Sequence, residues 1–358
     1  MTSKKSITCI SLFSGAGIGE TYFPRCGINV IVANELIKNR AELYAYSHPK
    51  TSVVCGDITQ DSVFQEIVDK TKKRRIDMIL ASPPCQGFSV AGKNRDQIKM
   101  SGDDRNYLIF YVIKAIDRFN PKYVLIENVP ALLDFVIYHN GVLLTVPELL
   151  QKQFGDAYVI ESRILNSADY GVPQRRKRAI IIMHKIGTTW NWPKPEKKIF
   201  TVRETIGNLP SLEAGQKSDI KWHFARKHTP ENILWMKHTP TGCSAFSNPV
   251  YFPKKADGTR IKGFMSSYRR IKWDEPAPTI TIRNDCIASQ RNVHPGRLLS
   301  DGTYSDARVL TPLELMLLDS LPANWHIPDD TSEILIRQVI GESIPPKMLL
   351  AVVKGIKK

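Results

Sequence analysis

The sequence lacks any Cys-x-x-Cys pair and any long apolar run. Its 6 cysteines are scattered over 358 residues, so we expect no metal site, and the scatter suits a reducing compartment where thiols stay free. No apolar stretch approaches the roughly 20 residues of a membrane helix. The amino terminus runs into a strand pattern instead of a signal peptide. These absences favour a cytoplasmic protein with no membrane segment.

The chain has fewer acidic than basic residues. The chain has 50 Lys and Arg against 35 Asp and Glu, a formal net charge of +15, which indicates a polyanionic partner. Residues 187–278 hold 16 of the basic residues and 8 of the acidic ones. Five of the 6 tryptophans also lie there, and we expect most of them to form a local core.

Short apolar segments alternate with amphipathic ones up to residue 185, which predicts an α/β fold: a parallel sheet with helices on both faces. A helix is expected at Asp104–Phe119, with Asp103 or Asp104 as its N-cap. The expected strands are Ile7–Phe13, Ile28–Ala33, Ser52–Cys55, Ile76–Ala81, Tyr123–Glu127, Tyr158–Leu165 and Arg178–His184.

The alternation stops after about Lys185. Residues 186–278 are rich in Pro, Gly, Trp and Lys without a clear period, which predicts a separate, irregular, small lobe containing some β-structure. A helical pattern returns at Thr311–Asp319, and a closing helix is expected to begin near Ile344–Pro346, where proline suits a helix start.

One cysteine stands in a stiff turn. Residues 82–89 read Ser-Pro-Pro-Cys-Gln-Gly-Phe-Ser and directly follow an expected buried strand. Open α/β sheets bind ligands at such strand ends. Two prolines fix the backbone before Cys85, and Gly87 lets another backbone come close. A buried structural cysteine is the alternative, but the flanking residues favour a nucleophile.

A glycine-rich turn, Ser14–Gly17, follows the first strand and could bind a ligand through its backbone N–H groups. The dinucleotide fingerprint has a third glycine where this chain has Glu20, and a carboxylate there would repel a pyrophosphate. Glu35 ends the second strand, where it can bind ribose hydroxyls, and Asp57 follows the third, where it can accept from an adenine amine. The set fits S-adenosylmethionine, unless both acids merely cap helices.

Two more polar segments follow strands. Glu127-Asn-Val-Pro130 ends the fifth strand, where its acid would share a crevice with Cys85, unless it caps a helix or is solvated. Tyr170–Arg178 places four cations within four positions, which is typical of a phosphate patch or a solvated basic turn.

Taken in order, these segments resemble the motifs of the DNA (cytosine-5)-methyltransferases of bacterial restriction–modification systems, over nearly the whole chain. Gln174, Arg176 and Arg178 fall on the family's Gln-x-Arg-x-Arg pattern. The other matching segments are Phe13–Gly17, Pro83–Ser89, Asp103–Leu108, Glu127–Val129, Arg308–Glu314 and Ile340–Pro346.

The resemblance implies methyl transfer from S-adenosylmethionine to carbon 5 of a cytosine flipped out of duplex DNA. Cys85 would add to carbon 6, Glu127 would bind N3 and the exocyclic amine, and Arg176 and Arg178 would hold O2 and the adjoining backbone. The implied cofactor-binding residues are Phe13, Gly15, Gly17, Glu35, Asp57, Ile58, Pro83 and Leu108. The implied DNA-binding residues are Gln86, Gly87, Ser89 and Gln174.

The resemblance also implies an organisation. Residues 1–185 would be the catalytic, cofactor-binding domain, 186–278 the target-recognition domain that reads base edges, and 279–358 a segment packing back onto the catalytic domain. Gly92–Gly102 would be a loop that closes over DNA. We expect a monomer, associated with the nucleoid through DNA, with a cognate restriction endonuclease as a possible partner.

Three positions depart from the family pattern: Glu342 replaces the usual Asn, Ser320 the Gly of Gly-Phe-Pro, and Leu36 a frequent aromatic residue. One alternative function is a tRNA cytosine-5 methyltransferase, against which the full-sized basic lobe argues. Another is a non-catalytic DNA-binding paralogue, which the intact Cys85 and Glu127 disfavour. A nicotinamide-dependent oxidoreductase would leave the Pro-Pro-Cys turn unexplained.

Overall fold

The chain forms two compact units in the computed structural model, which describes residues 6–84 and 107–357. The sheet unit comprises Met1–Asn166, Lys177–Lys194 and Leu349–Lys358; the loop-rich unit comprises Ser167–Arg176 and Pro195–Met348. The expected nucleophile Cys85 lies outside the described residues, as do Gln86, Gly87, Ser89 and the expected loop Gly92–Gly102.

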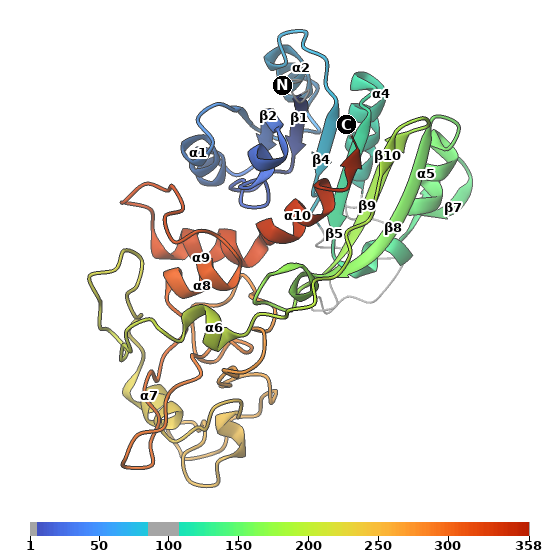
Figure 1. The fold of residues 1–358 in the computed structure, drawn as a ribbon. Coiled ribbons are helices and arrows are strands. Elements are labelled where there is room, and N and C mark those ends of the chain that lie inside the picture. Colours follow the sequence, from blue (N-terminus) through green and yellow to red (C-terminus); the bar gives the residue numbers. More distant parts are fainter. Residues whose placement is uncertain (1–5, 85–106, 358) are drawn as a thin grey trace. The chain divides into compact units, whose positions relative to one another are not determined.

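A seven-stranded sheet in the order β3-β2-β1-β4-β5-β9-β8 organises the sheet unit (Figure 1). Its first five strands pair in parallel, and β9 runs antiparallel to both β5 and β8. The strands are β1 (Ile7–Leu12), β2 (Ile28–Glu35), β3 (Ser52–Cys55), β4 (Met78–Ala81), β5 (Tyr123–Asn128), β8 (Tyr158–Asn166) and β9 (Lys177–Lys185). The predicted α/β class and the seven predicted strands are confirmed, but the sheet is only mostly parallel.

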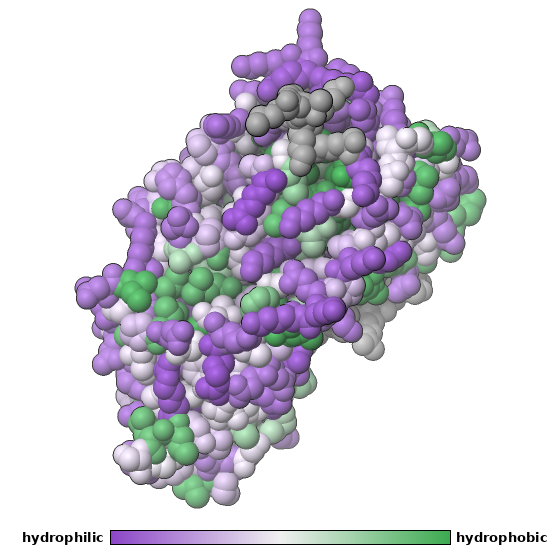
Figure 2. Space-filling model, in the orientation of Figure 1, coloured by the Kyte–Doolittle hydropathy of each residue, from purple (hydrophilic) through white to green (hydrophobic). Residues whose placement is uncertain are grey.

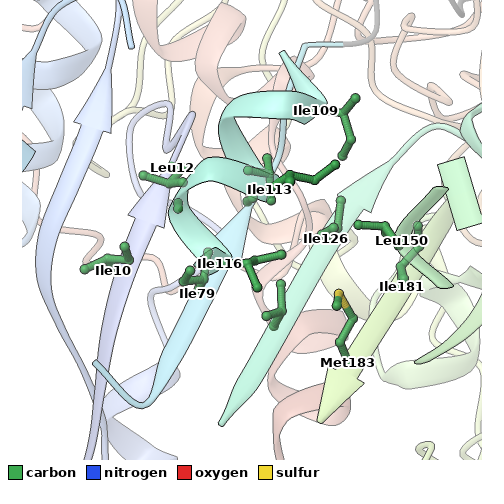
Figure 3. Packing of buried hydrophobic residues seen from close by; sticks show 14 of the residues in the cluster. Ile10, Leu12, Ile79, Ile109, Ile113, Ile116, Ile126, Leu150, Ile181 and Met183 are labelled. Carbon is green, nitrogen blue, oxygen red and sulfur yellow. The ribbon is translucent and has the colours of Figure 1, made fainter. Parts of the chain in front are cut away.

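Helices pack against both faces of this sheet. On one face, Ile113 and Ile116 of α4 lie over Ile79 and Ile126, which point up from β4 and β5 (Figure 3). Side chains alternate along a strand, so Tyr123 of β5 points to the opposite face. The helices of the sheet unit are α1 (Lys38–Ser47), α2 (Asp61–Lys70), α4 (Ile109–Phe119), α5 (Val146–Phe154) and most of α10 (Pro346–Val353).

The opposite face is closed by α1 and by the end of the chain. Trp190 packs edge-on against Tyr123 with ring centroids 5.7 Å apart, and its Nε1 donates to the carbonyl of Val352 at 2.9 Å. Short pairs complete the unit: β6 (Val136–His139) with β7 (Val142–Thr145), and β10 (Thr189–Trp190) with β11 (Ile356–Lys357). No helix in the described part of the chain is long and apolar enough to span a membrane.

Helix α4 differs from its predicted start. It begins at Ile109 with Leu108 in the N-cap position, and the expected cap residues Asp103 and Asp104 lie outside the described residues. Its end agrees with the sequence, because Asn120 takes a left-handed conformation with φ 45° and donates its N–H to the carbonyl of Ile116 at 2.8 Å. Asparagine is one of the few residues that tolerate this conformation.

The loop-rich unit has little regular structure. In residues 195–348, all of which the structure describes, strand pairing is limited to isolated bridges, so the β-structure expected for the lobe is reduced to these bridges there. Its helices are α6 (Val202–Ile206), α7 (Pro230–Lys237), α8 (Pro312–Leu318) and α9 (Glu333–Glu342). Residues 279–348 belong to this unit, and only Leu349–Lys358 joins the sheet unit, which differs from the expected boundary at 278.

The tryptophans of residues 187–278 mostly form core, as expected. Trp222, Trp235 and Trp273 are buried in the loop-rich unit, while Trp190 is buried in the sheet unit. Hydrophilic side chains cover most of the face shown in Figure 2, with apolar groups in small scattered patches. These four buried tryptophans therefore stabilise the fold and are not displayed for stacking on bases.

Buried arginines take the place of sheet pairing in the loop-rich unit. The four largest fully buried side chains in the described residues are Arg176, Arg270, Arg308 and Arg337. Arg270 alone donates to the carbonyls of Met236, His294, Ser305 and Asp306 at 2.8–3.3 Å. Buried carbonyls need hydrogen-bond donors, and a guanidinium offers five N–H groups. Part of the chain's positive charge is therefore structural.

Arg308 occupies the centre of a buried ionic cluster. It lies 2.9 Å from Asp306 and 2.8 Å from Glu314, and all three side chains are at most 1% exposed. Burial alone would raise the pKa of Glu314, yet the adjacent Arg308 lowers it to about 2. Glu314 also completes the capping box of α8 with Thr311, so the cluster fixes the helix start.

We expect Arg308→Met to destabilise the protein by about 3–5 kcal/mol, because it leaves the buried carboxylate of Glu314 without its arginine and removes one of the two arginines that pair with Asp306. Thermal and urea unfolding followed by circular dichroism would measure this loss. The matched control is Arg203→Met, since Arg203 forms an exposed ion pair with Asp274. The unfolding midpoint of this variant should stay near that of the unsubstituted chain. Equal behaviour of the two variants would contradict the structural role of Arg308.

Candidate active site

The glycine-rich turn after β1 has backbone conformations that only some residues tolerate. Phe13, Gly15 and Gly17 have φ of 57°, 56° and 72°. A Cβ atom at Gly17 would lie 2.6 Å from His48 and 2.8 Å from Tyr44, whereas one at Gly15 would meet no atom within 4 Å. Gly17 is thus required for packing against α1, and Gly15 borders open space that a ligand can occupy.

Glu35 is tied to this turn by its carboxylate. The side chain is buried at 6% exposure, and its Oε2 accepts from the Gly15 N–H at 2.8 Å while Oε1 accepts from the Ile37 N–H at 2.9 Å. Leu36, next to it, is 63% exposed. Glu35 therefore holds the glycine turn in place and presents a fixed carboxylate at the end of β2.

Asp57 follows the neighbouring strand β3. Its Oδ1 accepts from the Thr59 N–H at 2.9 Å, so it caps its own loop. Ile58 is buried in the apolar core, and Leu108 packs partly buried against the same core. Because β1, β2 and β3 are adjacent and parallel, their carboxyl ends bring Gly15, Glu35 and Asp57 to one edge of the sheet.

Glu20 has a different place from the one expected. It is 3% exposed and accepts hydrogen bonds from the Ser11 hydroxyl and the Tyr44 hydroxyl. Burial raises its pKa to about 7, although both hydrogen bonds act in the opposite direction. The Glu20 carboxyl group is therefore part of the packing between β1 and α1. The expectation that it repels a ligand at the turn is corrected.

Glu127 and Arg178 form the central polar pair of the sheet unit. Arg178 Nε lies 2.8 Å from Glu127 Oε1, with side chains 13% and 7% exposed. Glu127 is the penultimate residue of β5 and Arg178 the second residue of β9, and the antiparallel register sets Glu127 opposite Ile180. A charge-assisted hydrogen bond in a sheltered place is short and directional, so Arg178 orients the carboxyl group.

The turn that leads to Cys85 is anchored beside this pair. Strand β4 pairs with β5, and just after it the Ser82 N–H donates to the Leu12 carbonyl at 3.2 Å. Asn128, the residue after Glu127, donates from Nδ2 to the carbonyl of Pro83 at 2.9 Å. Pro83 is buried. The acid of β5 and the backbone before Cys85 are therefore fixed by neighbouring residues.

The sequence analysis missed two asparagines that organise the site. Asn128 holds Pro83, and Asn34 donates from Nδ2 to the carbonyls of Val54 at 3.1 Å and Gly56 at 3.0 Å. Asn34 thereby links the end of β2 to the loop before Asp57. The available signal was an amide at the end of an apolar strand, since a buried amide must find partners.

Gln174 and Arg176 are held by hydrogen bonds within the loop-rich unit. Both are buried in the loop-rich unit, at 0% and 2% exposure. Gln174 donates to Asp319 at 2.9 Å and accepts from the Ile280 N–H at 3.0 Å. Arg176 donates to the carbonyls of Ile280 at 2.7 Å and Gly341 at 2.9 Å. These contacts hold the loop-rich unit together, and the roles expected for both residues toward DNA and the cytosine O2 stay predictions.

Two of the residues that depart from the family pattern are Ser320 and Glu342. Ser320 adopts φ 66°, the left-handed conformation for which the usual glycine is suited, and its hydroxyl accepts from the Lys347 N–H at 3.3 Å. Glu342 is exposed at the last position of α9. The serine is therefore accommodated with some backbone strain.

Known proteins match this chain over nearly its whole length. A sequence profile of the C-5 cytosine-specific DNA methylase family matches residues 7–358. The Type II methyltransferase M1.HgaI of Avibacterium volantium is 57% identical over 353 residues, which cover 99% of each chain.

Solved structures share the fold at low sequence identity. The methyltransferase EhMeth of Entamoeba histolytica has a TM-score of 0.66 at 16% identity, with 98% of each chain covered. A DNMT2 variant of Spodoptera frugiperda has a TM-score of 0.61 at 20% identity, with 98% of this chain and 99% of that chain covered. The resemblance read from the motifs is thus confirmed, and this chain belongs to the C-5 cytosine-specific DNA methylase family.

Proposed function

We propose that Cys85 carries the methyl transfer by forming a covalent bond to carbon 6 of a cytosine extruded from duplex DNA. The observation that supports this most is the Glu127–Arg178 pair, 2.8 Å apart, next to the anchored Pro83 turn. The pair supplies an oriented acid beside the backbone that leads into Cys85. Addition to a pyrimidine ring requires an acid and a thiol, and Glu127 and Cys85 would supply them.

The chemistry divides among three side chains. The Cys85 thiolate forms a bond to carbon 6, and the ring electrons move so that carbon 5 becomes nucleophilic. Glu127 hydrogen-bonds N3 and the exocyclic amine and stabilises the charge that develops on the ring. Arg178 keeps the Glu127 carboxyl group in one orientation. After methyl transfer, the carbon 5 proton is lost and the bond to Cys85 breaks, which releases 5-methylcytosine and the thiolate.

The family uses S-adenosylmethionine, and we propose that the edge formed by β1, β2 and β3 holds it here. The open space at Gly15 admits a ligand, Glu35 presents a fixed carboxylate for hydroxyl groups, and Asp57 lies at the next strand end. When bound, the cofactor supplies the methyl group as a sulfonium. The remaining residues assigned to this site are Phe13, Gly17, Ile58, Pro83 and Leu108.

DNA is the substrate class of this family, and we propose that the target cytosine is flipped out of the helix, because a stacked base cannot reach a strand-end pocket. Gln86, Gly87 and Ser89, next to the nucleophile, would contact the DNA. Residues 186–278 would supply the target-recognition surface. A cognate restriction endonuclease and a cytoplasmic, nucleoid-associated location follow the Type II relatives. The relatives' names and the family description favour DNA over tRNA.

Replacing the nucleophile should abolish catalysis and spare binding. We expect Cys85→Ser to lose tritium transfer from S-adenosylmethionine and to lose the covalent adduct with 5-fluorocytosine duplex DNA, while the gel-shift affinity for DNA is kept. The control is Cys55→Ser, because Cys55 is an exposed thiol at the end of β3. Adduct formation by Cys85→Ser would rule out the assigned nucleophile.

Removing the acid should slow the chemical step. We expect Glu127→Gln to lower the single-turnover methylation rate by about 10²-fold or more, because the developing ring charge loses its stabilising group. DNA affinity should change little. The matched control is Glu66→Gln on α2, where the carboxylate is 51% exposed. A Glu127→Gln rate close to that of the control would contradict the role given to Glu127.

Closing the space at Gly15 should weaken cofactor binding. We expect Gly15→Ala to raise the Kd for S-adenosylmethionine roughly tenfold, a loss of about 1.4 kcal/mol, measured by calorimetry without DNA. The matched control is Gly141→Ala, since Gly141 also has positive φ, 80°, and no atom within 4 Å of a built Cβ. Both variants bear backbone strain, so an equal loss of cofactor affinity would show that strain, and not a filled site, is responsible.

A further inference from the structure

We propose that a basic pocket within the loop-rich unit binds phosphodiester groups of the DNA backbone. The pocket has a volume of about 370 Å³. Its lining includes five cationic side chains and a single carboxylate, that of Glu275. The proposal rests on the DNA substrate of the family and adds a binding surface that the motifs do not assign.

The cations converge from three separate segments of the chain. Arg175 lies in the basic run of residues 170–178, Arg269 and Lys272 lie on either side of Arg270-Ile271, and Arg291 comes from a later loop. Arg175 and Lys272 are more than half exposed, and Arg291 is exposed. Like charges from distant segments repel one another, so their convergence on one pocket indicates an anionic ligand.

Glu275 neutralises only part of this charge. It binds Arg175 Nη1 at 2.6 Å and Lys272 Nζ at 2.5 Å. Lys272 and then Arg175 lower its pKa, so it remains a carboxylate. Arg269 donates to the Met265 carbonyl at 3.3 Å, and within the described residues neither Arg269 nor Arg291 has a carboxylate in ion-pair range. Glu275 therefore occupies two cations that a phosphate would engage, and it competes with DNA.

The pocket is built on rigid structure. Arg270, at its inner wall, is fully buried and bonded to four carbonyls. Arg291 has φ 50° and is held by its N–H to the Ser266 carbonyl at 2.8 Å. A left-handed arginine is strained by roughly 1 kcal/mol, and glycine would fit at this place without strain. The protein therefore tolerates backbone strain at residue 291 while the Arg291 side chain lines the pocket.

DNA is the occupant that this charge pattern fits best. A duplex carries one phosphate charge per roughly 1.7 Å of its axis, so it can engage several cations spread around an exposed rim at once. Phosphate contacts position a protein on DNA without reading sequence. The cations at the rim of the pocket would therefore raise the affinity for any DNA duplex equally. They are Arg175, Arg269, Lys272 and Arg291.

The test measures how DNA affinity of the full chain depends on salt. In the variant Arg269→Gln/Arg291→Gly, two cations are lost and the glycine relieves strain at 291, so folding should be kept. We expect its affinity to fall roughly tenfold and the slope of log K against log salt to fall by about 1.8, near 0.9 per phosphate contact. Glu275→Gln should bind DNA severalfold more tightly. Lys221→Gln removes a cation that does not line the pocket and serves as the control.

Three readouts decide the outcome. An unchanged salt slope in the double variant would overturn the proposal, and so would an effect on only one of two unrelated duplexes, because that would indicate base reading. Protection from thermal unfolding by inorganic phosphate, abolished in the double variant while DNA affinity stays intact, would make this a small-anion site instead. Adduct yield with saturating 5-fluorocytosine DNA should not change, so failure here is separable from failure of the Cys85 mechanism.

Discussion

Parallel pairing of β1 with β2 and β4 is the constraint on which the site depends. It places the glycine turn, the ends of β2 and β3 and the Pro83 turn at one edge of the sheet. Single backbone hydrogen bonds extend past these strand ends, such as that from the Ser82 N–H to the Leu12 carbonyl, and side chains then fix the loops. Glu35 does this for the glycine turn, and Asn128 does it for the turn before Cys85. The same groups that hold the loops thus shape the site.

In the loop-rich unit, arginine side chains satisfy buried backbone carbonyls. Its chain is irregular, so many buried carbonyls have no strand or helix partner, and guanidinium groups supply the missing donors. Arg270 and Arg176 connect segments that are far apart in the sequence. This explains why a net charge of +15 overstates what is available to DNA. Some cations are structural, whereas the rim of the basic pocket is exposed.

The carboxylates also divide into two kinds. Glu314 pairs with Arg308 and Asp306 with both Arg308 and Arg297 inside the loop-rich unit, and Glu20 accepts hydrogen bonds from two hydroxyl groups. Glu127 is different because it and its partner Arg178 lie at the edge of the sheet from which the turn to Cys85 leaves β4. A buried acid that is oriented but placed beside an open strand end can act on a ligand. Location, more than residue type, separates the catalytic candidate from the structural acids.

The sequence by itself determined the α/β class and the strands of the sheet, because apolar periodicity and turn residues are local signals, and it supplied Glu127 and Cys85 as the candidate acid and thiol. It could not determine which residue of Gln174, Arg176 and Arg178 meets Glu127. Only the tertiary structure decided that, because the antiparallel entry of β9 sends Arg178 to the sheet and leaves the other two in the loop-rich unit. The burial of Glu20 was equally invisible, since it depends on Tyr44, 24 residues away. Long-range pairing and burial arise only when distant segments meet.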